Sequence, residues 1–213
     1  MKQTQERSIL IIDEVEEIAG QTRDEVVVHN AYFIPQKVGV ERYAELIDRG
    51  LAVQVLTNSL GSNDEIVTNS AYKRYRKPLL EAGVDLWEMR FDPEEAARLR
   101  TPPNQRGYTV LHTESFVVDR RLSFVGSPNL DPRAIDINTE MGILVDDPVL
   151  AQRILDGFAS ITVPENAWRV QLDEEGELLW ESSAGRTTRQ PAKTFGERVG
   201  DFFYSLILPE SQL

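Results

Sequence analysis

The sequence predicts an α/β protein with a central mixed, largely parallel β-sheet, followed by a C-terminal hairpin and an amphipathic tail. The first reason is that apolar strands alternate with helical segments between residues 24 and 90, which is typical of β-α-β units. The second is that several short strands follow one another between residues 109 and 147. The third is that the apolar pattern weakens after residue 163. We therefore expect a main domain over residues 1–163 and a C-terminal segment over residues 164–213.

The first part of the chain predicts a helix and then two β-α-β steps. Apolar side chains recur at helical spacing over residues 5–19, and Gly20 is placed to cap that helix. Strands and helices then alternate, which favours parallel pairing with right-handed crossovers. The expected elements are a strand at 25–35, a helix at 39–50, a strand at 52–60, a helix at 65–82 and a strand at 84–90.

The second part predicts shorter strands, one helix and the tail. Residues 91–107 are acidic, then basic, then Pro-rich, which predicts an exposed connection. Arg120 and Arg121 form a tight corner between two strands, and Asp147 before Pro148 is a helix start signal. The expected elements are strands at 109–119, 122–127 and 138–147, a helix at 147–160, a hairpin around Glu175 and Gly176, a polar linker to about residue 193 and an amphipathic end at 195–208.

Composition excludes several classes of function. The chain has 35 acidic residues against 23 Lys and Arg, a net charge of −12, so its overall field repels nucleic acid and anionic lipid. A phosphate-bearing ligand must therefore be bound by local groups. The absence of cysteine rules out disulfides and thiolate chemistry. No apolar run is long enough for a signal peptide or a membrane span, so we expect a cytoplasmic protein, with peripheral contact at the inner membrane left open.

One of the two histidines lies in a segment suited to phosphate chemistry. Alternation places His112 and Glu114 on the same face of an expected strand. The next strand ends in a Gly-Ser-x-Asn turn, whose backbone N–H groups, hydroxyl and amide are neutral donors for a phosphoryl oxygen. Histidine can attack phosphorus at neutral pH or protonate a leaving oxygen. A carboxylate on the following strand, Glu140, is the natural candidate to hold the imidazole in one tautomer.

This spacing resembles the HKD motif of the phospholipase D superfamily. The matching positions are His112, Glu114, Asp119, Gly126, Ser127 and Asn129. The blocks GSPNLDPRAIDINTEMGILVDDP, AYFIP, VLTNSLGSND, AYKRYRKPLLEAGVDLWE and LILPESQL are similar to those of bacterial cardiolipin-synthase-type members. The resemblance covers nearly the whole chain but only the C-terminal half of such a protein. It implies an α/β/α sandwich.

The resemblance also implies a mechanism. In the family, one motif histidine attacks the phosphodiester to form a phosphohistidine, and the histidine of a second motif protonates the leaving alcohol. Carried over, His112 is one of those two histidines and Glu140 orients it. Asp119 is the structural acid of the motif, and the turn of Gly126, Ser127 and Asn129 binds phosphate. The scheme needs no metal and no other cofactor.

Two departures from the family pattern affect the interpretation. The chain has one motif where a complete enzyme needs two, and His29 lies in no such motif. The family's lysine is Glu114 here. A unit charge about 5 Å from a phosphate is worth roughly 3 kcal/mol at an effective dielectric near 20, so reversing its sign costs up to about twice that.

Three functional hypotheses follow. The first is a half-site of a phospholipase D-type phosphodiesterase or phosphatidyltransferase. It would act on a phospholipid or other phosphodiester, with an N-terminal half that carries the other motif or as a homodimer. The second is a catalytically impaired phosphate-binding module, in which Glu114 and the missing second motif prevent turnover. The third is a nuclease, which the net charge of −12 disfavours.

Overall fold

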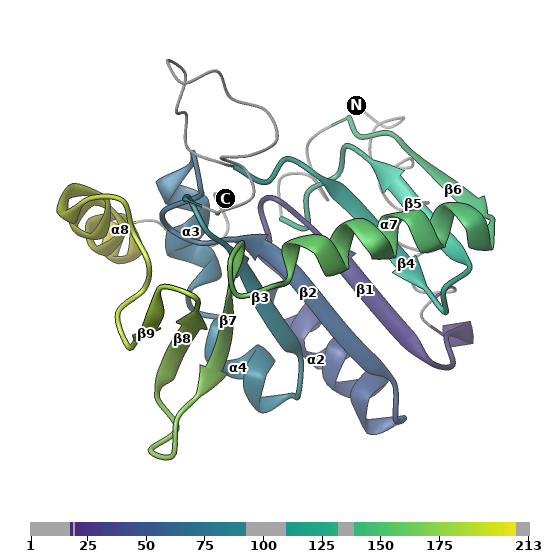
Figure 1. Cartoon of the computed structure of the whole chain (residues 1–213), viewed down its shortest axis with the longest axis horizontal. Helices are drawn as coiled ribbons and strands as arrows, with labels where there is room; N and C mark the ends of the chain where they lie inside the picture. The colour runs from purple at the N-terminus through teal and green to yellow at the C-terminus, as the bar shows by residue number, and fades with distance from the viewer. Residues whose placement is uncertain (1–17, 19, 93–109, 132–138, 208–213) are drawn as a thin grey trace.

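The computed structural model describes residues 18, 20–92, 110–131 and 139–207 (Figure 1). The expected N-terminal helix, apart from its last residues, and most of the connection at 91–107 lie outside the described residues. The strands are β1 (Glu25–His29), β2 (Ala52–Asn58), β3 (Asp85–Met89), β4 (Glu114–Val118), β5 (Leu122–Gly126), β6 (Gly142–Asp146), β7 (Ala167–Leu172), β8 (Leu178–Ser182) and β9 (Gly185–Thr187). The helices are α2 (Gln36–Asp48), α3 (Ile66–Tyr72), α4 (Arg76–Glu81), α7 (Pro148–Ile161) and α8 (Phe195–Ile207).

The described strands form one mixed sheet in the order β6-β5-β4-β1-β2-β3-β7-β8-β9. The pairs β1 with β2 and β2 with β3 are parallel, and the other six pairs are antiparallel. The expected mixed sheet is confirmed, but the expectation that it is largely parallel is wrong. Parallel neighbours need a long crossover, whereas β4 with β5 and β7 with β8 return through tight turns.

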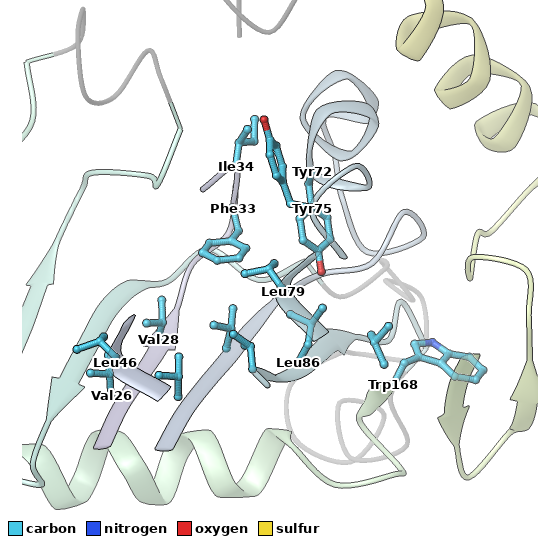
Figure 2. Packing of buried hydrophobic residues seen from close by; sticks show 14 of the residues in the cluster. Val26, Val28, Phe33, Ile34, Leu46, Tyr72, Tyr75, Leu79, Leu86 and Trp168 are labelled. Atoms are coloured by element: carbon cyan, nitrogen blue, oxygen red, sulfur yellow. The ribbon is translucent and has the colours of Figure 1, made fainter. Parts of the chain in front are cut away.

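The parallel strands are buried on both faces, which gives the expected three-layer sandwich. Val26 and Val28 of β1 pack toward α2 and α4 in one cluster, part of which Figure 2 shows. Val27 faces the opposite side and packs with Leu155 and Phe158 of α7. Figure 1 shows α7 crossing one face of the sheet, with α2 and α4 on the other. Each fully buried Val or Leu contributes on the order of 1.5–3 kcal/mol, so the two clusters stabilise the central strands between the helix layers.

The helix expected at 65–82 is instead two helices, α3 and α4. Pro78 lies in the first turn of α4. Its ring would clash with the carbonyl of Arg74 if one helix ran through, and it has no N–H to donate. The break therefore falls at residues 73–75, and Pro78 occupies a position that a helix start tolerates.

The C-terminal segment continues the central sheet. β7 pairs with β3, and the β7–β8 hairpin turns at Gly176, which has a φ of 77°. Helix α8 then packs beside α3. Among the described residues no helix is both long and apolar enough to span a bilayer.

A buried ion pair between α4 and β3 also contacts the C-terminal segment, through Trp180 of β8. Arg76 Nε lies 2.6 Å from Glu88 Oε1, and the two side chains are 1% and 0% exposed. Tyr72 Oη and Trp180 Nε1 also donate to the Glu88 carboxylate, each at 2.9 Å. Because every carboxylate oxygen has a donor, the buried charge is compensated.

The same network holds α8. Asp201 is the buried residue of this helix. Its carboxylate accepts hydrogen bonds from Asn69 Nδ2 at 2.8 Å, Gln190 Nε2 at 2.7 Å and Lys73 Nζ at 2.7 Å. Lys73, which directly follows α3, thus anchors α8.

Candidate active site

The sheet topology brings the candidate residues to one edge. β4 runs antiparallel to β1, so its start lies beside the carboxyl end of β1, with His29 opposite Ser115. The end of β5 and the start of β6 meet at the same level, because Glu114 is opposite Gly126 and Gly126 is opposite Gly142. The carboxyl ends of parallel strands are the usual place for ligand sites in α/β sheets.

His112 lies in an extended segment just before β4, not within the strand as expected. Its side chain is 61% exposed, and Nε2 is 3.4 Å from Asp64 Oδ2. The other Asp64 oxygen, Oδ1, accepts a hydrogen bond from Tyr32 Oη at 2.7 Å. The Tyr32 ring meets the imidazole edge to face, with centroids 6.1 Å apart.

The sequence analysis expected Glu140 to orient His112, but the hydrogen bond of its carboxylate is to Ser127. Its Oε2 accepts a hydrogen bond of 2.5 Å from Ser127 Oγ, and Ser127 is further tied to Met141 by backbone bonds of 2.8 Å and 3.1 Å. The carboxylate beside His112 is therefore Asp64, which the sequence analysis missed. Two signals were available: Asp64 lies in a polar stretch directly after a buried strand, and it ends the family-like block VLTNSLGSND.

Gly126 is required at the end of β5. A Cβ on this residue would lie 2.7 Å from the carbonyl oxygen of Met141 and 2.9 Å from the Phe124 ring. The Phe124 ring also stacks on Phe116, with centroids 5.0 Å apart. The Gly-Ser pair at the turn thus allows β6 to approach closely enough for Ser127 to meet Glu140.

Two buried asparagines, also missed by the sequence analysis, fix the backbone around the site. Asn58, at the end of β2, accepts from the Leu111 N–H at 2.9 Å and donates to the Leu111 carbonyl at 3.0 Å. Asn30, just after β1, accepts from the Leu130 N–H at 3.1 Å. The bonds of Asn58 hold the backbone just before His112, and the bond of Asn30 holds it just after Asn129. An asparagine at the end of each apolar strand was the available signal.

Asn129 sits in the expected phosphate turn. Its side-chain Oδ1 is buried and has no hydrogen-bond partner within the described part of the chain. A buried polar atom without a partner carries an energetic cost. This oxygen therefore does not contribute a hydrogen bond to the turn within the described part of the chain.

Asp119 lies at the far end of β4 from His112. Seven residues of extended chain span roughly 23 Å. Its carboxylate accepts backbone N–H bonds from Asp24 at 2.9 Å, Glu25 at 3.1 Å and Arg23 at 3.0 Å. Burial alone would raise the pKa of Asp119, but these bonds outweigh it and lower the pKa below its usual value. Asp119 therefore fixes the start of β1 and does not reach the His112 segment.

Carboxylates dominate the charge of the site. Glu114 is half-buried, and burial raises its pKa; Glu140 raises it further, while His112 opposes the shift. Of the Asp64, Glu114 and Glu140 carboxylates, that of Asp64 has a basic side chain near it among the described residues, His112, and the two form an ion pair only when His112 is protonated. The described part of the chain contains no group of three or more His, Cys, Asp or Glu that could hold a metal ion.

His29 belongs to the core instead of this site. It is 5% exposed, its Nδ1 is 3.0 Å from Ser115 Oγ, and its ring packs on Phe158 at 5.0 Å. Burial lowers its pKa to about 4. The imidazole is therefore neutral at physiological pH and has no path to a ligand.

Comparison with known proteins identifies relatives of this fold and sequence. The family model described as cardiolipin synthase, PLD-like domain, matches residues 15–162. Cardiolipin synthase C of Escherichia coli (strain K12) is 32% identical over 202 residues, which cover 91% of this chain and 42% of that protein. The chain thus spans less than half the length of this curated relative.

Solved structures agree on the fold. NucT from Helicobacter pylori superposes with a TM-score of 0.55 at 14% identity, over 72% of this chain and 87% of that chain. Nuc from Salmonella typhimurium, a phospholipase D family member, gives a TM-score of 0.53 at 15% identity over the same shares. From the family match, the relatives and the shared fold, the chain belongs to the phospholipase D superfamily, within the family of cardiolipin synthase PLD-like domains.

Proposed function

We propose that this chain forms one half-site of a phospholipase D-type phosphodiesterase or phosphatidyltransferase. The observation that supports the proposal is that the segment of His112 and the Gly126-Ser127-x-Asn129 turn lie at the same edge of the sheet, since Glu114 is opposite Gly126 beside the carboxyl end of β1. The turn offers neutral donors for phosphate, and the exposed imidazole is accessible to a ligand. The phosphodiester chemistry that we propose for this arrangement is taken from the family to which the chain belongs.

The proposed reaction has two steps. An imidazole nitrogen of one histidine attacks phosphorus, the bond to the leaving alcohol breaks, and a second histidine gives that oxygen a proton. Water or another alcohol then attacks the phosphohistidine, passes its proton to the second histidine and frees the first. His112 supplies one of the two histidines, and Ser127 and Asn129 bind the phosphoryl oxygens.

The second histidine comes from another phospholipase D-like half, either a separate half or a second copy of this chain. The exposed apolar residues of β5 and β6 support this. Val125 is 45%, Met141 78% and Ile143 66% exposed, and they adjoin Ser127 and Glu140. β6 is also the edge strand of the sheet, so a partner there would cover the apolar patch and face the site at once.

The proposed substrate is a phospholipid such as phosphatidylglycerol, since the named relative is a cardiolipin synthase. Helix α8 supports peripheral contact with a lipid surface. Its apolar face is not covered by the domain: Phe202 is 57%, Leu206 67% and Ile207 72% exposed. Aromatic and aliphatic side chains on one face of a helix are typical of interfacial binding.

A catalytically impaired phosphate-binding module is the second candidate. Asp64 lies beside His112, and Glu114, which occupies the place of the family's lysine, is close enough to His112 and Glu140 for both charges to affect its pKa. Negative groups at this distance weaken phosphate binding and slow attack on an anion. A nuclease is less well supported, because a net charge of −12 repels nucleic acid.

Turnover measurements separate these candidates. Release of product from phosphatidylglycerol vesicles is measured for the native chain and for His112→Ala, alone and with a phospholipase D-like half that carries the other motif. Mass in solution is determined in parallel. Asp156→Asn, at an exposed α7 position bonded to Gln152, serves as the matched control. Turnover that His112→Ala abolishes and Asp156→Asn leaves intact supports the half-site. No turnover in any combination favours the binding module.

A further inference from the structure

We propose that Glu114 is a specificity-determining residue that selects a phosphodiester whose alcohol carries a positively charged nitrogen. The inference rests on the proposed function and refines the headgroup chemistry of that same half-site. Glu114 is the first residue of β4 and lies opposite Gly126, where the phosphate turn begins. Residues directly opposite each other in an antiparallel pair have Cα atoms about 4.5–5.5 Å apart, so Glu114 lies beside the turn.

The surroundings of Glu114 do not compensate its negative charge. Burial raises the pKa of Glu114; the charge of His112 lowers it, and that of Glu140 raises it again. Within the described part of the chain no Lys or Arg forms an ion pair with Glu114. The place that a lysine occupies in the family therefore holds an acid next to a second acid.

A phosphodiester at the turn adds another negative charge to this place. Two like charges about 5 Å apart repel each other strongly enough to change an affinity by more than a hundredfold at an effective dielectric near 20. A cation on the ligand itself removes much of this cost, because the bound group is then neutral as a whole. In an alcohol of the ethanolamine or choline type, two carbons separate the nitrogen from the ester oxygen, so the cation stays close to the phosphate.

Tyr32 offers a second contact for such a cation. It follows β1, and its ring centroid lies 6.1 Å from that of the His112 imidazole. Burial raises the pKa of Tyr32, and the hydrogen bond and charge of Asp64 and the charges of Glu65 and Glu114 raise it further. Glu114 therefore acts at the Tyr32 side chain as well as at the turn. Aromatic rings attract cations, so a nitrogen beside Glu114 has both a carboxylate and a ring near it.

The exposure of the site sets the size of the effect. Glu114 is half-buried, so solvent and salt screen part of its field. We expect the remaining preference for a cationic headgroup over an uncharged one to be on the order of tenfold in Kd. The replacement of the family's lysine by Glu114 is then a change of specificity, and the anionic headgroup of phosphatidylglycerol is the poorer ligand at this turn.

The test compares matched soluble phosphodiesters that bind to the free chain. Glycerophosphocholine and glycerophosphoethanolamine carry a cationic nitrogen, whereas glycerophosphoglycerol has the same backbone without it. Titration followed by NMR of the backbone amides gives Kd for native protein, Glu114→Gln and Glu114→Lys. The control is Glu41→Gln, which makes the same change of charge at an exposed α2 position paired with Lys37. Urea unfolding shows that each variant is folded.

Native protein and Glu41→Gln should bind both cationic ligands on the order of tenfold more tightly than glycerophosphoglycerol, and salt should weaken this preference. In Glu114→Gln the preference should fall to within about twofold, and in Glu114→Lys it should reverse. Native protein that binds none of the ligands, or all of them equally, overturns the proposal. A preference that survives in Glu114→Gln overturns it as well.

Turnover separates this inference from the proposed function. Product release is measured on phosphatidylethanolamine and phosphatidylglycerol vesicles with the complementary half present. Turnover that depends on His112, together with equal Kd values for the soluble ligands, keeps the proposed function and rejects the role of Glu114. A preference in binding that Glu114→Gln removes, without turnover in any combination, rejects the proposed function and retains Glu114 as the selecting residue.

Discussion

Ser127 Oγ donates its hydrogen bond to the Glu140 carboxylate, and this bond joins the phosphate-style turn to the start of β6. The hydroxyl expected to bind phosphate is therefore engaged by an acid in the free protein. A phosphate that binds at the turn must compete with Glu140 for that hydrogen and must also approach its negative charge.

Glu140→Gln is expected to strengthen phosphate binding. The amide oxygen can still accept from Ser127, but the negative charge is gone. Because the site is exposed, solvent screens the gain, and we expect a several-fold lower Kd for inorganic phosphate at neutral pH. Titration followed by NMR of the Ser127 amide measures it. Ser127→Ala serves as the opposite control, since it removes a donor, and an unchanged or higher Kd for Glu140→Gln would contradict the account.

Glu114→Gln is expected to stabilise the fold at neutral pH. Burial raises the pKa of Glu114, so the folded state holds its proton more tightly than the unfolded chain does. The protonated carboxyl group of Glu114 therefore contributes stability at low pH, and that contribution is lost as pH rises through its folded pKa. Urea unfolding of native protein and Glu114→Gln at pH 4 and pH 7 checks this. The gain should appear at the higher pH; an equal gain at both values would rule out the charge as its cause.

His29 makes stability depend on pH in the opposite sense. Burial lowers its pKa from 6.5 to about 4, so the unfolded chain binds a proton more readily. The contribution of His29 to the free energy of unfolding is fully present above pH 6.5. It falls by about 3 kcal/mol as pH drops from 6.5 toward 4. His29→Gln, which cannot titrate, is expected to show a flatter profile by urea unfolding. A native profile as flat as that of the variant would mean that His29 is not buried as a neutral ring.

The buried Arg76–Glu88 pair is expected to be a large single contribution to stability. Glu88→Ala leaves the guanidinium without its carboxylate at a site that is 1% exposed, and breaking such a pair costs about 3–5 kcal/mol. Glu181→Ala removes the partner of Arg186 at the surface, where the side chains are 39% and 68% exposed, and should cost less than about 1 kcal/mol. Urea unfolding compares the two. Similar losses would show that burial does not decide the cost.

Local sequence patterns predicted much of the fold. Alternating apolar segments predicted the central strands and their two parallel pairs. Pro78 explains the break between α3 and α4, which the sequence analysis did not predict. The antiparallel majority was missed because pairing between distant strands depends on how the whole sheet closes. β7 pairs with β3, about 80 residues earlier in the chain, and no local pattern encodes that choice.

The candidate site likewise combines residues that local patterns predicted with residues that they did not predict. His112, Ser127 and Asn129 were predicted as site residues because their spacing lies within one short stretch. Asp64 was missed because it meets His112 only after β2 and β4 take their places on either side of β1. Glu140 was predicted to orient His112, whereas its hydrogen bond in the structure is to Ser127, a contact that depends on the register of β5 with β6. Contacts that depend on strand register can be identified only once the pairing of the strands in the folded sheet is known.

Hydrolysis of a simple phosphodiester by Glu114→Lys, with and without His112→Ala, tests the central claim most directly. Restoring the positive charge at residue 114 should raise the rate above that of the native chain by tenfold or more, since even half of the roughly 3 kcal/mol charge term exceeds a factor of ten. Adding His112→Ala should abolish that rate. A Glu114→Lys variant no faster than native protein, or one whose activity survives the loss of His112, would contradict the account.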